Sequence, residues 1–149
     1  MRLSGIKRLV FMTTVFSLGS VVWPAEVVLK TNPLVISFFR QNQLQVFLQL
    51  ENKASQVLNI TVEPVITDVK TETPIEARPS VSLLLAPNFS GEVSFIVPAS
   101  GLKPWSHWDP QLYYLDLTLK TGSSVIKAER VRFGYREVWT EKGKIYING

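Results

Sequence analysis

An alternation of apolar and polar residues with a period of two is the feature that most restricts how this chain can fold. In residues 43–51 every second position is leucine or valine, and the positions between them are polar except for Phe47. Residues 112–120 repeat the pattern, with Leu115, Leu117 and Leu119 separated by polar side chains. Side chains at alternate positions lie on opposite faces of a β-strand. Both segments are therefore predicted to be strands that bury one face, with Phe47 as an exception on an outer face.

Other short apolar runs, separated by turn residues, follow residue 26. These runs are residues 27–29, 34–39, 57–69, 81–85, 92–97 and 124–133. Residues 71–79 are polar, contain two prolines and are predicted to be a loop, while Pro64 indicates an edge strand or a bulge. About seven short strands with frequent turns favour an all-β fold, an immunoglobulin-like antiparallel β-sandwich. The absence of cysteine excludes the disulfide-linked antibody type.

The apolar faces of these strands define a predicted core and a division of the chain. The predicted core residues are Leu44, Val46, Leu48, Leu50, Leu58, Ile60, Val62, Leu83, Leu85, Phe95, Leu115, Leu117 and Leu119. A turn at residues 141–144 predicts a hairpin that joins residues 138–140 to 145–147. We therefore expect the sandwich to span residues 26–137 and a C-terminal hairpin to span residues 138–149.

The first 25 residues have the character of an export signal. Arg2, Lys7 and Arg8 precede an apolar run at residues 9–23, which is shorter than the roughly 20 residues that cross a bilayer as a helix. We expect a signal peptide at residues 1–25, a secreted or periplasmic protein and no stable membrane span. The alternative is that this segment forms the first strand of the domain.

Charge and composition argue against several classes of ligand. The chain carries 16 basic and 12 acidic side chains, and residues 1–20 hold three of the basic ones, so the remainder has 13 against 12, or +1. This small net charge gives no support to nucleic-acid binding. With no cysteine and a single histidine, we expect no disulfide, no metal site and no cofactor.

Three segments resemble the immunoglobulin-like β-sandwich domain of glycoside hydrolase family 2. Residues 44–52 (LQVFLQLEN) are similar to an early core strand of that domain. Residues 103–115 (KPWSHWDPQLYYL) are similar to its aromatic corner. Residues 131–149 (VRFGYREVWTEKGKIYING) are similar to the segment that leaves the sandwich and enters the catalytic barrel. The matching positions of the corner are Trp105, Asp109, Pro110, Leu112 and Tyr113.

The resemblance implies a function as well as a fold. The family includes β-galactosidases, β-glucuronidases and β-mannosidases, and its two catalytic glutamates lie on the barrel. The resemblance therefore implies a non-catalytic domain, inactive alone, that is a scaffold between sugar-binding and catalytic domains. It also implies a chain truncated before the barrel, with that missing catalytic domain as its partner. The residues alone leave a second function open, a free-standing exported sandwich that binds a glycan or another protein.

Aromatic residues in the C-terminal part are the candidate contact residues. Residues 103–149 hold three of the four tryptophans, all four tyrosines and the only histidine. Flat rings stack on the apolar faces of sugars and also pack between domains. The candidates for sugar or interdomain contact are Trp105, His107, Trp108, Tyr114, Trp139 and Tyr146. The alternative is that Trp105 and Tyr113 belong to the core and that Trp108 packs against a neighbouring domain.

The sequence predicts no catalytic activity for this chain, and it predicts that the C-terminal hairpin is only marginally stable by itself. His107 has no nucleophile of recognised context near it, and the acidic residues occur without paired neighbours. The hairpin carries apolar residues on both faces, and an isolated two-stranded ribbon is marginal in water. We therefore expect an exposed apolar patch around Trp139, Tyr146 and Ile147, with partial disorder or self-association as the consequence.

Overall fold

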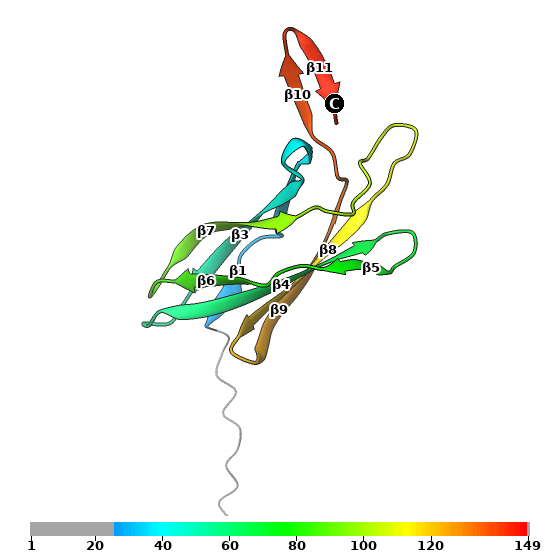
Figure 1. The fold of residues 1–149 in the computed structure, drawn as a ribbon. Helices are drawn as coiled ribbons and strands as arrows, with labels where there is room; N and C mark the ends of the chain where they lie inside the picture. Colours follow the sequence, from blue (N-terminus) through cyan, green and yellow to red (C-terminus); the bar gives the residue numbers. More distant parts are fainter. Residues whose placement is uncertain (1–25, 149) are drawn as a thin grey trace, which may run out of the picture.

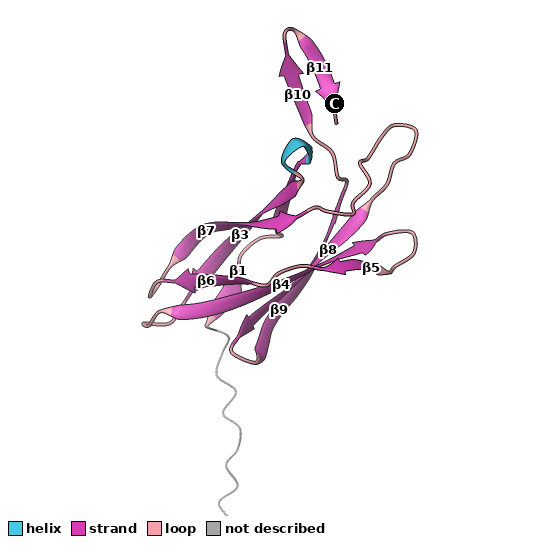
Figure 2. Ribbon diagram, in the orientation of Figure 1, coloured by secondary structure: helices cyan, strands magenta, loops and turns pink. Residues whose placement is uncertain are grey.

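The computed structural model describes residues 26–148, so the predicted signal peptide lies outside the described residues. Strands dominate this part of the chain, which contains one 3-10 turn, η1 (Phe39–Gln41), and no α-helix (Figure 2). The first sheet contains β1 (Val27–Leu29), β2 (Leu34–Phe38), β3 (Gln43–Asn52) and β7 (Ser90–Pro98). The second contains β4 (Leu58–Asp68), β5 (Pro74–Ala77), β6 (Val81–Leu85), β8 (Tyr113–Thr121) and β9 (Ser124–Phe133). A separate hairpin of β10 (Val138–Glu141) and β11 (Lys144–Ile147) projects beyond one end of the sheets (Figure 1).

Each sheet is organised around one long central strand. β3 pairs with β7 along one side and with β2 and β1 along the other. β4 pairs with β8 along one side and with β6 and β5 along the other, and β9 then pairs with β8. All these pairs are antiparallel, and β3 and β7 are neighbours although three strands separate them in the chain. The predicted immunoglobulin-like antiparallel sandwich is confirmed.

The core lies between the two sheets and consists mainly of the residues that the alternation predicted. Every predicted core residue is buried except Leu83, which is half-buried because β6 lies at an edge of its sheet. The alternation of β3 and β8 is a direct consequence of this packing, since one face of each strand meets the opposite sheet. Further buried apolar residues, which the prediction left out of the core, are Val27, Ala54, Ile66, Val97, Ala99, Leu102, Phe133 and Tyr135.

Two predictions based on proline need correction. Residues 71–79 are not all loop, because β5 pairs with β4, and Pro74 is its first residue, where the missing N–H interrupts least. Pro64 does not lie on an edge strand, because β4 is central to its sheet. It does occupy a gap on one side of β4, since β5 ends with Ala77 opposite Val65 and β6 begins with Val81 opposite Val62. Proline is tolerated there because no strand faces it on that side.

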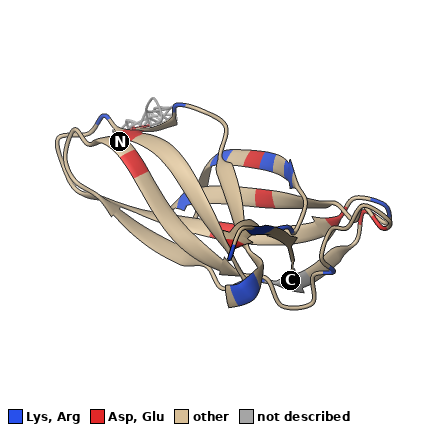
Figure 3. Ribbon diagram, turned by 90° about the horizontal axis from the view of Figure 1, so that it is seen from above, with Lys and Arg blue, Asp and Glu red and all other residues tan. Residues whose placement is uncertain are grey.

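Charges of both signs are distributed over the strands and loops. Figure 3 shows basic and acidic residues interspersed over the described part of the chain in a view from above. Within residues 26–148, no helix has the length and apolar character that a membrane crossing requires.

Candidate functional site

The aromatic corner connects β7 with β8 and is fixed at its base by Tyr113. The side chain of Tyr113, the first residue of β8, is only 2% exposed. Its hydroxyl accepts from the backbone N–H of Lys103 at 2.8 Å and donates to the Lys103 carbonyl at 3.3 Å. Burial raises the pKa of Tyr113 above its ordinary value, which keeps the hydroxyl protonated and able to do both. Tyr113 is therefore a core residue, as the packing alternative predicted.

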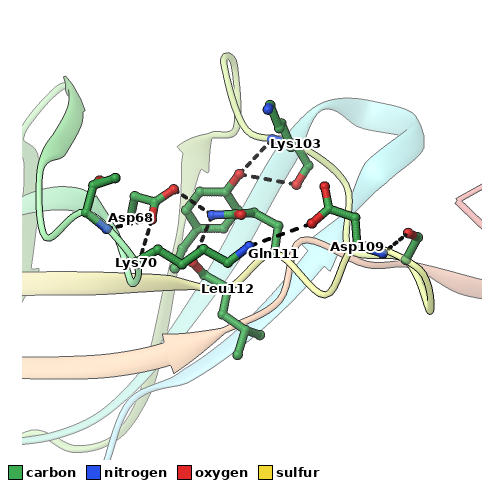
Figure 4. A network of polar contacts seen from close by, with 9 residues as sticks. Asp68, Lys70, Lys103, Asp109, Gln111 and Leu112 are labelled. Carbon is green, nitrogen blue, oxygen red and sulfur yellow. Dashed lines mark hydrogen bonds and ion pairs between the residues drawn. The ribbon is translucent and has the colours of Figure 1, made fainter.

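A polar network braces the rest of this loop (Figure 4). Gln111 donates from Nε2 to a carboxylate oxygen of Asp68, the last residue of β4. Lys70 Nζ lies 3.8 Å from the carboxylate of Asp109, whose backbone N–H donates to Ser106 Oγ at 2.9 Å. The loop is thus tied to the last residue of β4 and to Lys70 in the connection between β4 and β5.

Trp108 stands at the tip of the braced loop and is 90% exposed. The ring of His107 meets it edge-on, with centroids 4.9 Å apart and planes inclined by 72°. An indole held in solvent by a fixed loop presents a flat apolar surface to a ligand or to another domain. The geometry is compatible with both of the contacts that the sequence foresaw for this pair.

Trp105 lies away from the tip, at the junction of the sandwich and the hairpin. A Cβ on Gly134 would lie 3.3 Å from Cδ1 of Trp105, so glycine is what lets the ring approach the backbone this closely. The guanidinium of Arg136 lies over the same ring, 4.6 Å from its centroid. The backbone N–H of Trp105 donates to the carbonyl of Tyr135 at 2.9 Å. Trp105 is half-buried by these contacts and acts as a packing residue of the junction.

Tyr114 lies on a third surface, the outward face of β8. Arg130 lies over its ring at 4.7 Å from the centroid, and Arg130 Nε also donates to Asp116 at 2.6 Å. The six predicted contact residues therefore occupy three separate places, which are the loop tip, the outer face of the second sheet and the hairpin with its root. Sequence proximity had grouped Tyr114 with the loop, but its position on a strand directs it elsewhere.

Trp139 and Tyr146 stack on one face of the hairpin. Their ring centroids are 5.5 Å apart, and the ring planes are inclined by only 12°. The guanidinium of Arg40, in η1, lies 4.3 Å from the centroid of the Trp139 ring. Arg40 also binds the Glu137 carboxylate, with its backbone N–H at 3.0 Å, its Nε at 2.9 Å and its Nη2 as a third donor. The hydrogen bonds from Arg40 lower the pKa of Glu137 below its ordinary value. Glu137 is consequently an ionised anchor rather than a proton donor.

Asn148, which follows β11, attaches the hairpin to the sandwich through two side-chain hydrogen bonds. Its Nδ2 donates to the carbonyl of Trp105 at 2.7 Å, and its Oδ1 accepts from the N–H of Glu137 at 2.9 Å. Asn148 has a φ of 56°, in the left-handed region that asparagine tolerates better than most residues. The sequence gave no sign of the bond to Trp105, because the two residues are 43 positions apart.

The exposed apolar patch lies on the face of the hairpin opposite the stacked rings. Val138, Ile145 and Ile147 are 53%, 74% and 51% exposed, and the register places all three on one face. The predicted patch was therefore right for Ile147 and wrong for Trp139 and Tyr146. These two are half-buried because they stack on each other and Arg40 lies over Trp139.

A groove of about 660 Å³ opens beside the hairpin root, between the edges of the two sheets. One wall consists of residues 35–38 of β2, and the other consists of residues 132–134 and 136–138, which run from the end of β9 to the start of β10. Trp105 and Leu112 complete the lining. Sequence reasoning missed this groove, because its walls come from segments about 100 residues apart.

No cluster of three or more His, Asp or Glu side chains suited to hold an ion is found among residues 26–148.

The fold and these contacts define an immunoglobulin-like β-sandwich that carries an anchored terminal hairpin. The chain belongs to the glycosyl hydrolases family 2, whose family model matches residues 29–136. Among solved structures, it is similar to a family 2 β-galacturonidase from Eisenbergiella tayi, with a TM-score of 0.63 and 23% identity, over 83% of this chain and 21% of that one. A family 2 member from Bacteroides cellulosilyticus matches with a TM-score of 0.60 and 19% identity, over 79% of this chain and 16% of that one. These likenesses concern the fold, and no curated protein sequence matches.

Proposed function

We propose that this chain is a non-catalytic sandwich domain of a family 2 glycosidase, a scaffold that holds sugar-binding and catalytic domains relative to each other. The observation that carries the proposal is the hairpin, which is fixed to the sandwich on one face and exposes Val138, Ile145 and Ile147 on the other. An apolar face held in a defined orientation is suited to contact another domain. The chain spans about a fifth of the family 2 structures that it resembles, so the partner is a domain of such an enzyme.

The end of the sandwich that carries the hairpin supports this role. The loop between β7 and β8 projects at the same end (Figure 1), and this loop exposes the indole of Trp108. A retaining glycosidase needs two carboxyl groups about 5–5.5 Å apart, one as acid and one as nucleophile. Glu137, the acid in the groove wall, is already bound by Arg40. The proposed role is therefore positional, and hydrolysis belongs to the partner domain.

The proposal is tested on the purified chain with aryl β-galactoside, β-glucuronide, β-mannoside and β-galacturonide substrates. The expected result is no turnover above background, while a dye that binds apolar surface binds the hairpin. The double variant Ile145→Ser and Ile147→Ser should lose most of that dye binding, whereas Leu84→Ser, which removes a leucine that is 74% exposed on β6, should keep it. Turnover by the purified chain would refute the non-catalytic role.

The exposed Trp108 favours one alternative function, glycan binding by a free-standing exported sandwich. A glycan that binds the isolated chain and is lost in Trp108→Ala, but not in Trp108→Phe, would favour this alternative over the scaffold. Absence of binding to a broad set of glycans would support the scaffold.

Export to the periplasm or the medium is part of the proposal, and the basic and apolar leader supports it. Expression of the whole chain in a bacterial host, followed by N-terminal sequencing of the exported protein, tests it. The expected product has lost the leader. An unprocessed chain that stays in the cytoplasm would contradict export.

A further inference from the structure

The walls of the groove beside the hairpin root are strand edges rather than strand faces. Four consecutive residues of β2, 35–38, line one wall, and the last two residues of β9, 132–133, with Gly134 directly after them, line the other. Because side chains alternate along a strand, a wall of consecutive residues is formed by the edge of the strand. Within residues 26–148, β2 pairs only with β3, and β9 pairs only with β8. The second edge of each strand is therefore free of a partner strand.

A hydrogen bond links β2 to the residue that follows β9. Ser37 donates from Oγ to the carbonyl of Gly134 at 3.2 Å. Free strand edges whose backbone groups point into a groove can accept an extended segment by adding its backbone to the sheet. Two free strand edges beside one groove therefore favour an extended polypeptide over a compact ligand.

The charge of the groove indicates the sign of its ligand. Arg132 and Arg136 both line it, and neither has an ion-pair partner among residues 26–148. The acid in the wall, Glu137, is bound by Arg40, and the neighbouring Arg130 is bound to Asp116. The ring of Trp105 supports the guanidinium of Arg136 at 4.6 Å. A guanidinium stacked in this way keeps its N–H groups available to bind a carboxylate with two parallel hydrogen bonds.

We propose that this groove binds an extended acidic polypeptide segment, which pairs with the edge of β2 or β9 and places its carboxylates against Arg132 and Arg136. The inference extends the proposed function and rests on it only for the source of the segment, which is the domain that the hairpin contacts. Arginines on a strand edge also have a simpler use, because charged side chains prevent edge-to-edge aggregation. A test has to separate these two uses.

The test uses the purified, isotope-labelled chain and three probes in two-dimensional amide spectra. The probes are a blocked peptide of three Val-Glu repeats, the matched peptide of three Val-Gln repeats and free glucuronate. The acidic peptide should shift the amides of residues 35–37 and 132–134, and its binding should weaken as salt is added. The neutral peptide should bind at least about tenfold more weakly.

Variants assign the binding to the two arginines. The double variant Arg132→Gln and Arg136→Gln should lose about tenfold or more in affinity for the acidic peptide. The variant with lysine at both positions should lose less, because it keeps the charge without the fork geometry. Lys127→Gln removes a charge from β9 outside the groove lining and should change nothing. An unchanged unfolding midpoint shows that each variant is folded.

Several results would overturn the inference, and none of them depends on the scaffold role. Equal binding of the neutral peptide would show that charge is not recognised. Equal binding of glucuronate at the same amides would make the ligand a small carboxylate rather than a strand. Absence of peptide binding, with or without aggregation of the glutamine variant, would contradict the proposal. The arginines would then serve only to prevent edge-to-edge aggregation.

Discussion

The sandwich and the terminal hairpin are both built from antiparallel strands, yet they are stabilised by different interactions. In the sandwich, residues such as Leu117 and Leu119 are 1% exposed and pack against the opposite sheet. In the hairpin no residue of β10 or β11 is buried. The hairpin is anchored by hydrogen bonds from Arg40 to the Glu137 carboxylate and from Asn148 to the Trp105 carbonyl. Burial is non-directional and shared among many side chains, whereas these anchors are few and directional. The comparison implies that the hairpin can detach while the sandwich stays folded.

The largest expected effect comes from the sandwich side of the comparison. Leu117→Ala leaves a cavity between the sheets and should lower the free energy of unfolding by about 2–5 kcal/mol. Urea unfolding of the whole domain measures it. The control Leu84→Ala, at a position 74% exposed, should change stability by no more than about 0.5 kcal/mol. Equal effects of the two variants would mean that the core is not where the structure places it.

The next effect tests whether the hairpin is a separate unit. Asn148→Ala removes the partners of the Trp105 carbonyl and the Glu137 N–H, each hydrogen bond contributing about 1 kcal/mol. Amide hydrogen exchange of residues 145–147 should become faster, while exchange in β3 and β8 stays unchanged. Asn148→Asp, which keeps the acceptor and loses the donor, should have an intermediate effect. Equal acceleration in the sandwich would contradict separate stability.

A smaller and pH-dependent effect is expected from the other anchor. The pKa of Glu137 is lowered, chiefly by hydrogen bonds from Arg40. A lowered folded-state pKa means that the carboxylate stabilises docking above the ordinary glutamate value of about 4.3, and that this contribution is lost as pH falls below it. Protection of the hairpin amides should therefore be steady from neutral pH down to about pH 5 and then decrease.

The variant Glu137→Gln identifies the source of that decrease. It should reduce the protection of the hairpin amides several-fold at neutral pH and remove most of its dependence on acid. Glu141 also acts on Arg40 electrostatically, so Glu141→Gln is the matched control and should keep the acid-dependent step. A step that persists in Glu137→Gln would show that another group controls docking.

The smallest effect concerns the turn of the hairpin. Lys142 and Gly143 have φ values of 49° and 75°, as a two-residue hairpin turn requires. Asparagine tolerates this conformation better than lysine, so Lys142→Asn should stabilise the hairpin by about 0.5 kcal/mol. Gly143→Ala should have the opposite sign. Amide exchange at residues 145–147 in each variant, compared with the unmodified chain, measures the change in hairpin stability. The unfolding midpoint of the sandwich should not change in either variant.

The candidate site was less accessible to sequence reasoning than the fold. The sequence identified Trp105, Trp108 and Trp139 as notable, but it could not show that one packs on Gly134, one is 90% exposed and one lies beneath Arg40. An arginine in the sequence gives no sign of whether it is paired. Arg40 and Glu137 are 97 positions apart, so their pairing depends on how the whole sandwich closes.

The amino-acid sequence by itself determined the all-β class, the core faces of the long strands and the position of the terminal hairpin. These features follow from local rules, because a period of two fixes which face of a strand is buried and a Lys-Gly pair between short strands fixes a turn. Only the tertiary structure decided which face of the hairpin is exposed and that a groove lies between β2 and β9. It also decided that Pro64 of the central strand β4 faces the gap between β5 and β6. Each of these depends on contacts between segments distant in the chain, and such contacts exist only once the two sheets have packed together.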